Sequence, residues 1–344
     1  MAAESKRHHL VVVGASAGGI EALRSLLGAL PADFPAAILV VVHLAPAGTS
    51  VLPEILTRAG ELRATAAADG EPIEGGHIYV ASPDSHLLVE DGKVRVTRGP
   101  TVNGHRPAVD PLFRSAASTW GEAVAGVVLS GVLDDGTAGL AAVKAAGGMT
   151  LVQDPAEALY SGMPDSAIEF VHPDVVASAA DIGRALAAAA GEPPPDPPSS
   201  HGANGNTFLE VDRGATEEPY DNAAPTGLSC PYCNGGIWLA HEHGVDVFRC
   251  RVGHEFTPEA LHVQQSGQVE QALWTALRAL EEHAAMSRRI AQRMTRGGQS
   301  GPAARFARRA DDTVQQATII RRVLESPAFA AAEAADELDA ERAS

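Results

Sequence analysis

Apolar runs alternate with amphipathic stretches along the first part of the chain. The runs are short and contain few polar residues, which is typical of parallel strands buried on both faces. They predict strands at 10–13, 37–42, 77–81, 123–130 and 149–153. The stretches between them predict helices at 20–30, 54–59, 110–121, the segment before Ala146 and 179–190. This alternation predicts an α/β fold with a doubly wound, mostly parallel sheet.

Two local signals refine this outline. The segment 87–96 alternates around Asp91-Gly92, which predicts an antiparallel hairpin with a tight turn. Asp110 and Pro111 predict the start of a helix, with Asp110 as its cap, and Gly121 predicts its end. Because open α/β sheets carry their sites at the carboxyl ends of the strands, the loops that follow the strands are the first candidates for chemistry.

Composition divides the chain into segments. The stretch 191–226 begins with repeated Pro and stays polar, which predicts a semi-rigid linker after a folded unit at 8–190. Beyond the linker we expect a small Cys-containing unit at 227–257, a pair of helices at 258–327 and a flexible acidic and Ala-rich tail at 328–344.

Charge and hydropathy exclude several classes of protein. The 344 residues include 26 Lys+Arg and 43 Asp+Glu, a formal net charge of −17, which disfavours a protein that coats nucleic acid or an anionic membrane. Hydrophobic residues make up 45% of the chain, enough for a core. No apolar run reaches the roughly 18 residues of a membrane span. The N-terminus lacks the apolar segment of a secretory signal, so we expect a cytoplasmic protein.

Three polar residues follow predicted strands at one edge of the sheet. Ser16 lies in Gly14-x-Ser-x-Gly18, a strand–turn–helix context typical of a nucleophile. His43 follows the second strand, and Asp135 lies in the loop after the strand at 123–130. A Ser nucleophile needs an imidazole base and an orienting carboxylate, so this combination predicts a catalytic triad.

Other interpretations of these loops remain open. The residues could form a glycine-rich turn, a loop histidine and a turn aspartate with no catalytic role. A nucleotide-binding protein would use the glycines at 14–19 on phosphates, but it would need an acid after the second strand, where this chain has His43. The order Ser-His-Asp also differs from the Ser-Asp-His order of α/β-hydrolases.

The same loops resemble the catalytic domain of the CheB-type protein-glutamate methylesterases of bacterial chemotaxis. Six motifs of that family occur in order over roughly residues 8–190. They are the run at 14–19, His43-Leu-Ala-Pro46, Tyr79-Val-Ala-Ser-Pro83, His105-Arg-Pro-Ala-Val-Asp110, the Asp135-Gly136 loop and Gly162-Met-Pro164.

The resemblance implies a serine hydrolase that removes methyl esters from glutamate side chains of a receptor-like protein. Ser16 would be the nucleophile, His43 the general base and then acid, and Asp135 the partner of His43, with the adjacent Asp134 as the alternative. The same acyl-enzyme would allow glutamine deamidation, and the reaction would need no cofactor.

The resemblance also implies roles for residues around the triad. The N–H groups of Ala17 and Val132 would bind the oxyanion, although the family commonly has Met at the position of Val132. His105 and Arg106 would line the substrate cleft. The alternative for this pair is a structural loop in which the Arg binds a carboxylate.

One departure from the family concerns regulation. Chemotaxis members usually carry an N-terminal phospho-receiver domain, whereas here the first predicted strand begins near residue 9. We therefore expect no phosphorylation control within the chain and look to a separate regulatory protein. This departure leaves the chemotaxis setting open.

The three cysteines of the chain form one pattern with a histidine. Cys230, Cys233, Cys250 and His254 have the spacing C-x2-C-x16-C-x3-H, which predicts a small zinc ribbon with a structural metal site. Similar tails follow some CheB-like proteins that lack a receiver domain. The alternative is three reduced thiols and an unrelated histidine.

The segment 258–327 has two stretches with apolar residues at helical spacing. They predict an antiparallel helical hairpin with a break from Gly297 to Pro302 and a seam for a homo-oligomer. The apolar positions are Leu273, Leu277, Leu280, Ala284, Met294, Phe306, Ala310, Val314, Ala317 and Leu324. An alternative function follows from this region: a catalytically idle or differently specific scaffold that acts in signalling through its C-terminal third.

Overall fold

The computed structural model describes residues 9–43, 50–190 and 223–326. The tail predicted at 328–344 and most of the linker predicted at 191–226 lie outside these residues. The chain forms two compact units, the first running to Leu261 and the second beginning at His262. The helix α8 (Pro258–Arg296) begins in the first unit and contributes most of its length to the second.

A seven-stranded sheet with the order β3-β4-β2-β1-β7-β8-β9 forms the centre of the first unit, and all adjacent strands in it are parallel. The strands are β1 (Leu10–Ala15), β2 (Ala37–Val42), β3 (Arg63–Ala66), β4 (His77–Val80), β7 (Val124–Val128), β8 (Met149–Gln153) and β9 (Val175–Ala177). β1, β2 and β7 are buried along their whole length. The predicted mostly parallel sheet is confirmed, with β1 between β2 and β7 at its centre.

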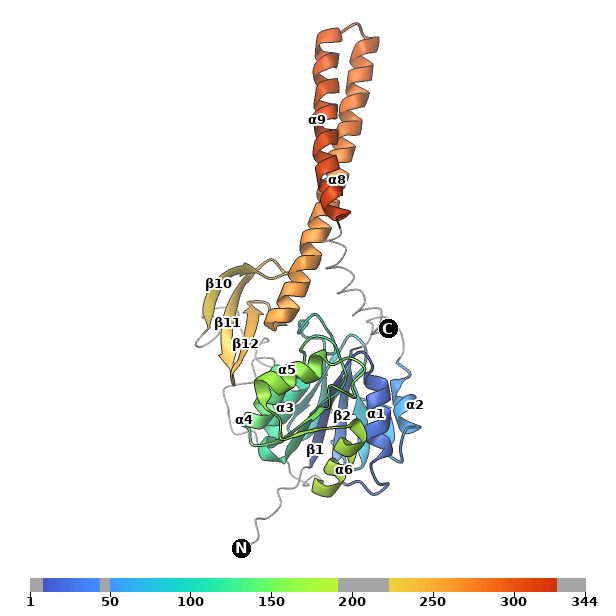
Figure 1. Ribbon diagram of the computed structural model, residues 1–344, viewed down its shortest axis with the longest axis vertical. Coiled ribbons are helices and arrows are strands. Elements are labelled where there is room, and N and C mark those ends of the chain that lie inside the picture. Colours follow the sequence, from blue (N-terminus) through green and yellow to red (C-terminus); the bar gives the residue numbers. More distant parts are fainter. Residues whose placement is uncertain (1–8, 44–49, 191–222, 327–344) are drawn as a thin grey trace. The chain divides into compact units, whose positions relative to one another are not determined.

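Helices cover both faces of this sheet, which makes it doubly wound (Figure 1). They are α1 (Gly19–Gly28), α2 (Leu52–Thr57), α3 (Val109–Trp120), α4 (Thr137–Ala145), α5 (Gly162–Val171) and α6 (Ala179–Ala189). Leu23 of α1 and Ile182 of α6 pack into the core on one face. Phe113 of α3 and Leu140 of α4 pack into the core on the other face.

This unit differs from the sequence prediction at the start of α3 and in two short strands. Asp110 does not cap α3, because Ala108 is the N-cap residue and Asp110 lies within the first turn. Its buried carboxylate instead accepts the N–H groups of Gly136 and Gly139, at 3.1 and 2.6 Å. The strands β3 and β9 were not predicted, because they are only four and three residues long and none of β9 is buried.

The predicted hairpin is confirmed as a separate two-stranded sheet of β5 (His86–Glu90) and β6 (Lys93–Thr97). Asp91 and Gly92 form its turn with φ of 48° and 72°, the pair of positive values that a tight hairpin turn requires. The hairpin is anchored to α3 where the Val89 N–H donates to the Ser115 hydroxyl at 3.0 Å.

A four-stranded antiparallel sheet follows in the same unit. Its strands are β10 (Ala224–Ser229), β11 (Gly236–Glu242), β12 (Val245–Cys250) and β13 (Glu255–Phe256). We refer to residues 224–257 as the ribbon. β10 begins at Ala224, inside the segment predicted as linker. Val245 and Val247 belong to the same buried cluster as Phe113 and Leu140, so the ribbon shares a core with the α/β sheet.

A buried cluster of charged residues joins the ribbon to α3. Glu255 of β13 forms ion pairs with Arg114 of α3 and Arg249 of β12. Arg249 also pairs with Glu242, whose carboxylate lies 3.8 Å from the Arg114 Nε. Burial works against the charge of Glu255, but the two guanidinium groups outweigh it and hold the pKa of this carboxyl at about 2.

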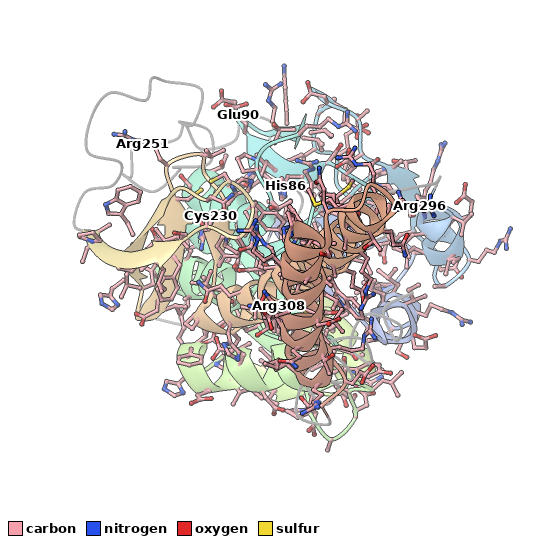
Figure 2. The ribbon with its side chains drawn as sticks, turned by 90° about the horizontal axis from the view of Figure 1, so that it is seen from above. His86, Glu90, Cys230, Arg251, Arg296 and Arg308 are labelled. Atoms are coloured by element: carbon pink, nitrogen blue, oxygen red, sulfur yellow. The ribbon has the colours of Figure 1, made fainter. Side chains whose placement is uncertain are left out.

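The second unit consists of α8 and α9 (Ser300–Leu324). Leu277, Ala317 and Leu324 form its small buried cluster. Arg296 and Arg308 lie on its surface (Figure 2). α9 begins at Ser300, so the predicted break to Pro302 is too long, because Pro is tolerated in the first turn of a helix. Among the described residues, no helix is long and apolar enough to cross a membrane.

The charged cluster predicts an unequal effect of two arginine substitutions on stability. Arg114→Leu leaves Glu255 buried with one cationic partner, and we expect the free energy of unfolding to fall by about 3 kcal/mol. Arg95→Leu breaks an ion pair with Asp69 in which both side chains are about half exposed, and should cost less than about 1 kcal/mol. Denaturant unfolding of the two variants measures the difference, and equal losses would contradict this account of the cluster.

Candidate active site

Ser16 lies on a tight turn between β1 and α1. Its N–H donates to the Ser130 carbonyl at 3.0 Å, and its own carbonyl accepts the Gly19 N–H at 2.9 Å. Gly18 in this turn has a φ of 70°, and a Cβ there would lie 2.7 Å from the Leu159 Cβ and from the Ser130 Oγ. Only glycine fits this backbone without strain. The turn therefore holds Ser16 at the carboxyl edge of the sheet, next to the N-terminus of α1.

The Ser16 hydroxyl faces the imidazole of His43, the residue that follows β2. The Ser16 Oγ lies 3.1 Å from His43 Nδ1, and His43 Nε2 lies 2.7 Å from Asp135 Oδ2. A carboxylate only accepts, so these partners assign the ring proton to Nε2 and leave the Nδ1 lone pair facing Ser16. All three side chains are buried. This geometry is able to remove the proton of the serine hydroxyl.

Asp135 is surrounded by hydrogen-bond donors. Besides His43, its carboxylate accepts from the Asn103 Nδ2 at 2.9 Å and from the N–H groups of Val109 and Asp110 at 2.7 and 3.3 Å. Val109 and Asp110 begin α3, so the positive end of a helix points at this carboxylate. Burial opposes the negative charge, but His43 and these donors outweigh it and hold the pKa of Asp135 well below its ordinary value.

The neighbouring Asp134 has different partners. Its Oδ1 accepts the hydroxyl of Thr257 at 2.7 Å. Burial raises the pKa of Asp134 to about 8, and the nearby Glu259 adds to this effect. A carboxyl that is neutral near pH 7 is a weak partner for an imidazolium ion. Of the two adjacent carboxylates, Asp135 is the one that contacts His43.

The part of the chain that contains the three candidate triad residues is similar to known proteins. The family model described as CheB methylesterase matches residues 11–186, just over half of the chain. The chain belongs to the CheB methylesterase family. The matched region contains Ser16, His43 and Asp135, as well as the helices on both faces of the sheet.

Individual relatives agree with this assignment. A protein-glutamate methylesterase/protein-glutamine glutaminase 2 from Anaeromyxobacter dehalogenans is 41% identical over 184 residues, which are 54% of this chain and 54% of that protein. One of the same name, without the number, from Photorhabdus laumondii is 43% identical over 164 residues, 46% of this chain and 47% of that protein. The chain spans about half the length of the curated relatives it matches.

A solved structure shows the same fold. The crystal structure of the Thermotoga maritima CheB methylesterase catalytic domain is 36% identical and aligns with a TM-score of 0.51, covering 53% of this chain and 98% of that chain. The CheB fold thus accounts for the α/β sheet and its helices, and the ribbon and helical hairpin are additional to that domain.

The two residues expected to line the cleft of this CheB family member have different surroundings. The His105 ring stacks on the His43 ring, with centroids 3.6 Å apart and planes 10° apart. Burial, and then the proximity of His43, lower the pKa of His105 to about 3, so it stays neutral. Arg106 donates to Asp84 at 2.8 Å and to the Gly99 carbonyl at 2.8 Å. Its guanidinium therefore anchors a loop, as in the structural alternative for this pair.

The two expected oxyanion donors belong to segments that lie next to Ser16. Ala17 follows it directly, and Val132 belongs to the loop that begins at Gly131. A Cβ on Gly131 would lie 3.0 Å from the Ser16 Cβ and 2.1 Å from the Met163 Sδ, so this loop passes directly beside the serine. Within residues 9–43 and 50–190, neither the Ala17 N–H nor the Val132 N–H has a hydrogen-bond acceptor.

Sequence reasoning missed two polar residues next to the triad. Asn103 contacts Asp135 and Asp110, and Thr257 of the ribbon contacts both Asn103 and Asp134. Asn103 lies two residues before the motif that begins at His105, so that motif was the signal that could have pointed to it. No pattern in the sequence connects Thr257 with it, because the two are 154 positions apart.

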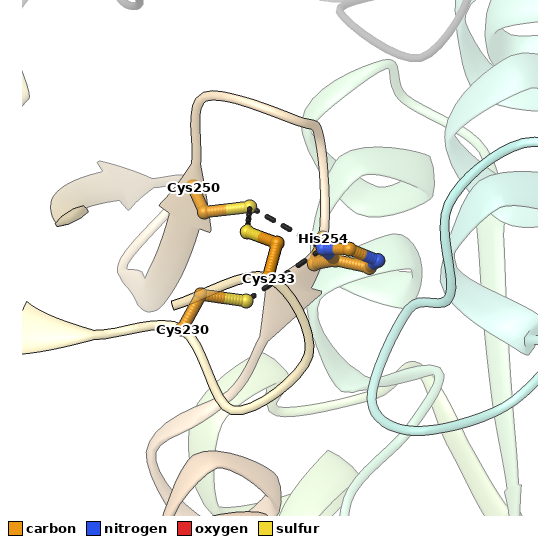
Figure 3. Close-up of side chains that lie close together, drawn as sticks. All are labelled: Cys230, Cys233, Cys250 and His254. Atoms are coloured by element: carbon orange, nitrogen blue, oxygen red, sulfur yellow. Dashed lines mark hydrogen bonds between the residues drawn. The ribbon is translucent and has the colours of Figure 1, made fainter. Parts of the chain in front are cut away.

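The ribbon holds a candidate metal site (Figure 3). Its four ligand atoms, three Sγ and the His254 Nδ1, all lie within 4.8 Å of one another. The separations include 3.6 Å between the Cys233 and Cys250 sulfurs and 3.4 Å between the Cys250 Sγ and His254. Ligands placed about 2.0–2.3 Å from a tetrahedral zinc ion lie at comparable distances from one another. The residues present therefore fit a closed, four-ligand site.

Proposed function

We propose that this protein is a serine hydrolase that removes methyl groups from esterified glutamate side chains of a protein substrate. The observation that carries the proposal is the chain of two hydrogen bonds from Ser16 through His43 to Asp135, inside the region that matches the CheB family. Relatives that share this region are named protein-glutamate methylesterases, which supports the substrate class.

The reaction follows from the positions of these groups. The Ser16 oxygen attacks the ester carbonyl carbon while His43 Nδ1 takes the hydroxyl proton. Asp135 accepts the Nε2–H and stabilises the imidazolium that forms. The bond to the methoxy oxygen then breaks, and methanol leaves with the proton from His43. Water, activated by the same imidazole, hydrolyses the glutamyl-serine ester and restores the free serine.

Two further features support this reaction. The Ala17 and Val132 N–H groups would donate to the oxyanion of the tetrahedral intermediates. The neutral His105 ring packs on His43 and would limit its movement. We assign no substrate contact to Arg106, since its Nε, Nη1 and Nη2 all donate to Asp84 or to the Gly99 carbonyl.

We extend the proposal to glutamine deamidation. Attack of Ser16 on a glutamine side chain would release ammonia in place of methanol and form the same acyl-enzyme. The relatives from A. dehalogenans and P. laumondii carry both activities in their names. Neither activity needs a metal or an organic cofactor in the steps described.

The biological setting is also a proposal. We expect the substrate to be a methylated, chemoreceptor-like protein and a separate protein to supply regulation by phosphorelay. All three cysteines lie together as candidate metal ligands and none forms a disulfide among the described residues, which favours the reducing cytoplasm. A scaffold without catalysis is the alternative, and the polar network around His43 disfavours it, since an idle protein has no need of a buried Ser-His-Asp arrangement.

We propose that the ribbon binds zinc through Cys230, Cys233, Cys250 and His254. A zinc ion with four protein ligands has no open position, so it would serve structure and not catalysis. The ribbon has a small core around Ile237 and Phe256, and the metal would supply much of its folding energy.

Methanol release tests the reaction and its nucleophile together. With a methyl-esterified receptor fragment as substrate, the wild type should release methanol, and Ser16→Ala should lower kcat by about 10^6-fold. A fluorophosphonate should label the wild type at Ser16 and leave Ser16→Ala unlabelled. Absence of both methanol release and labelling in the wild type would overturn the proposed function.

Two aspartate variants test which carboxylate serves His43. Asp135→Asn removes the charge that stabilises the imidazolium, and we expect kcat to fall by about 10^4-fold. Asp134→Asn keeps an oxygen that accepts the Thr257 hydroxyl and should lower kcat by less than about tenfold. Steady-state methanol release measures both variants. The reverse order of effects would assign the role to Asp134.

Metal analysis tests the zinc site. The purified protein should contain one zinc per chain, and His254→Ala should lose most of it because three ligands remain. His241→Ala is the matched control, since His241 lies on β11, is largely exposed and pairs with Asp246. Elemental analysis after dialysis measures the content. Equal zinc in both variants would exclude His254 as a ligand.

A further inference from the structure

The segment from His254 to Thr257 connects the candidate metal site with the surroundings of the triad. Cys250 N–H donates to the His254 carbonyl at 3.0 Å, which closes the metal-binding loop. Immediately afterwards, the Glu255 N–H donates to the Thr101 carbonyl, and the Asn103 N–H donates to the Glu255 carbonyl, at 3.3 and 2.8 Å. A short stretch of the ribbon thus pairs with residues 101–103 as a neighbouring strand would.

Thr257 then contacts two side chains beside the triad. Its N–H donates to the Asn103 Oδ1 at 2.8 Å, and its hydroxyl donates to the Asp134 Oδ1 at 2.7 Å. Thr257 is itself buried, at 2% exposure. These contacts are shielded from water, so each is worth more than the same contact at the surface.

Asn103 connects this segment with Asp135 through hydrogen bonds to both. Its Oδ1 accepts from Thr257, and its Nδ2 donates to Asp135 at 2.9 Å and to Asp110 at 3.0 Å. The side chain cannot rotate about its terminal bond without exchanging donor and acceptor, which would break its hydrogen bonds to all three partners. The backbone of Thr257 therefore fixes which end of the amide faces the carboxylate that holds His43.

The orientation of the Asn103 amide matters because it binds the carboxylates of Asp110 and Asp135. Asp110 and Asp135 are both buried, and burial, followed by the charge of Asp135, raises the pKa of Asp110 to about 7. Asn103 is a side chain that donates to both carboxylates. If its amide turned or withdrew, Asp135 would keep only His43 and the backbone donors of α3.

We propose that Asn103 and Thr257 are positioning residues for the reaction, and that the ribbon acts through them as a structural arm of the active site that its metal keeps in place. The inference rests on the proposed hydrolase function and on the proposed zinc site. In this role the ribbon does not contact the substrate. Through Asn103 it holds Asp135, and through Asp135 it holds the imidazole of His43.

Residue substitutions test the arm in the full-length protein with the methylated receptor fragment as substrate. Asn103→Ala removes a donor to a buried carboxylate, and we expect kcat to fall about 30-fold with KM changed less than twofold. Thr257→Val removes the bond to Asp134 and the bond that the hydroxyl accepts from the Ala260 N–H, and it should lower kcat about fivefold. Thr257→Ser keeps the hydroxyl and both bonds, and should stay within about twofold of wild type. Fluorophosphonate labelling of Ser16 should slow in the same order.

Thr226→Val is the matched control within the ribbon. The Thr226 hydroxyl donates to the Ile237 carbonyl and accepts the Leu228 N–H, both inside the ribbon sheet. We expect its kcat and labelling rate to equal those of the wild type. A decrease as large as that of Thr257→Val would show a general effect of ribbon stability and overturn the proposal. The proposal would also be overturned if Thr257→Val had the kcat and labelling rate of the wild type, or if Thr257→Ser lost as much activity as Thr257→Val.

Metal removal tests the arm with a readout other than activity. After chelation of the wild type, amide hydrogen exchange at 101–104 should become at least about tenfold faster together with exchange at 254–257, and zinc should restore both. Faster exchange confined to the ribbon would overturn the role of the metal. If the wild type releases no methanol, the proposed function and the inference fail together; if it does and Thr257→Val is unchanged, the inference alone fails.

Discussion

The charge of a buried carboxylate governs the construction of this site. Asp135 is almost completely buried, and an isolated ion in such a place would be far too costly without partners. Its donors come from three parts of the chain: the loop at Asn103, the first turn of α3 and the imidazole of His43. The positions of these elements are coupled, because none can shift without leaving part of that charge unsatisfied.

Local sequence patterns could predict most of the sheet and the three residues of the candidate triad. Buried parallel strands have continuous apolar sequences, so β1, β2, β4, β7 and β8 could be predicted, whereas the short strands β3 and β9 could not. Ser16, His43 and Asp135 could be proposed together because each follows a strand, and strand ends meet at one edge. The sequence did not indicate which way the buried carboxylate of Asp110 turns: a helix-cap residue and a residue that binds a neighbouring loop have the same local pattern.

Contacts between distant segments explain the remaining differences. Whether Arg106 faces a substrate or an aspartate depends on Asp84, which belongs to another loop. The place of Thr257 depends on how the ribbon packs, and that in turn depends on a core shared through Val245 and Val247. Such contacts arise only when the tertiary structure forms. The spacing of the four candidate metal ligands, by contrast, is a local property, and it could be recognised directly.

The shared core and the pairing of Glu255 with Arg114 make the CheB-like sheet and the ribbon mutually dependent. A chain cut after Ala190 would keep every strand of the parallel sheet, yet it would expose the apolar surface that Val245 and Val247 cover. It would also leave Arg114 without its carboxylate partners from the ribbon. The position at which the family's similarity ends therefore does not coincide with the edge of this buried core. A substitution on one side of this contact therefore has to be compatible with the side chains on the other side.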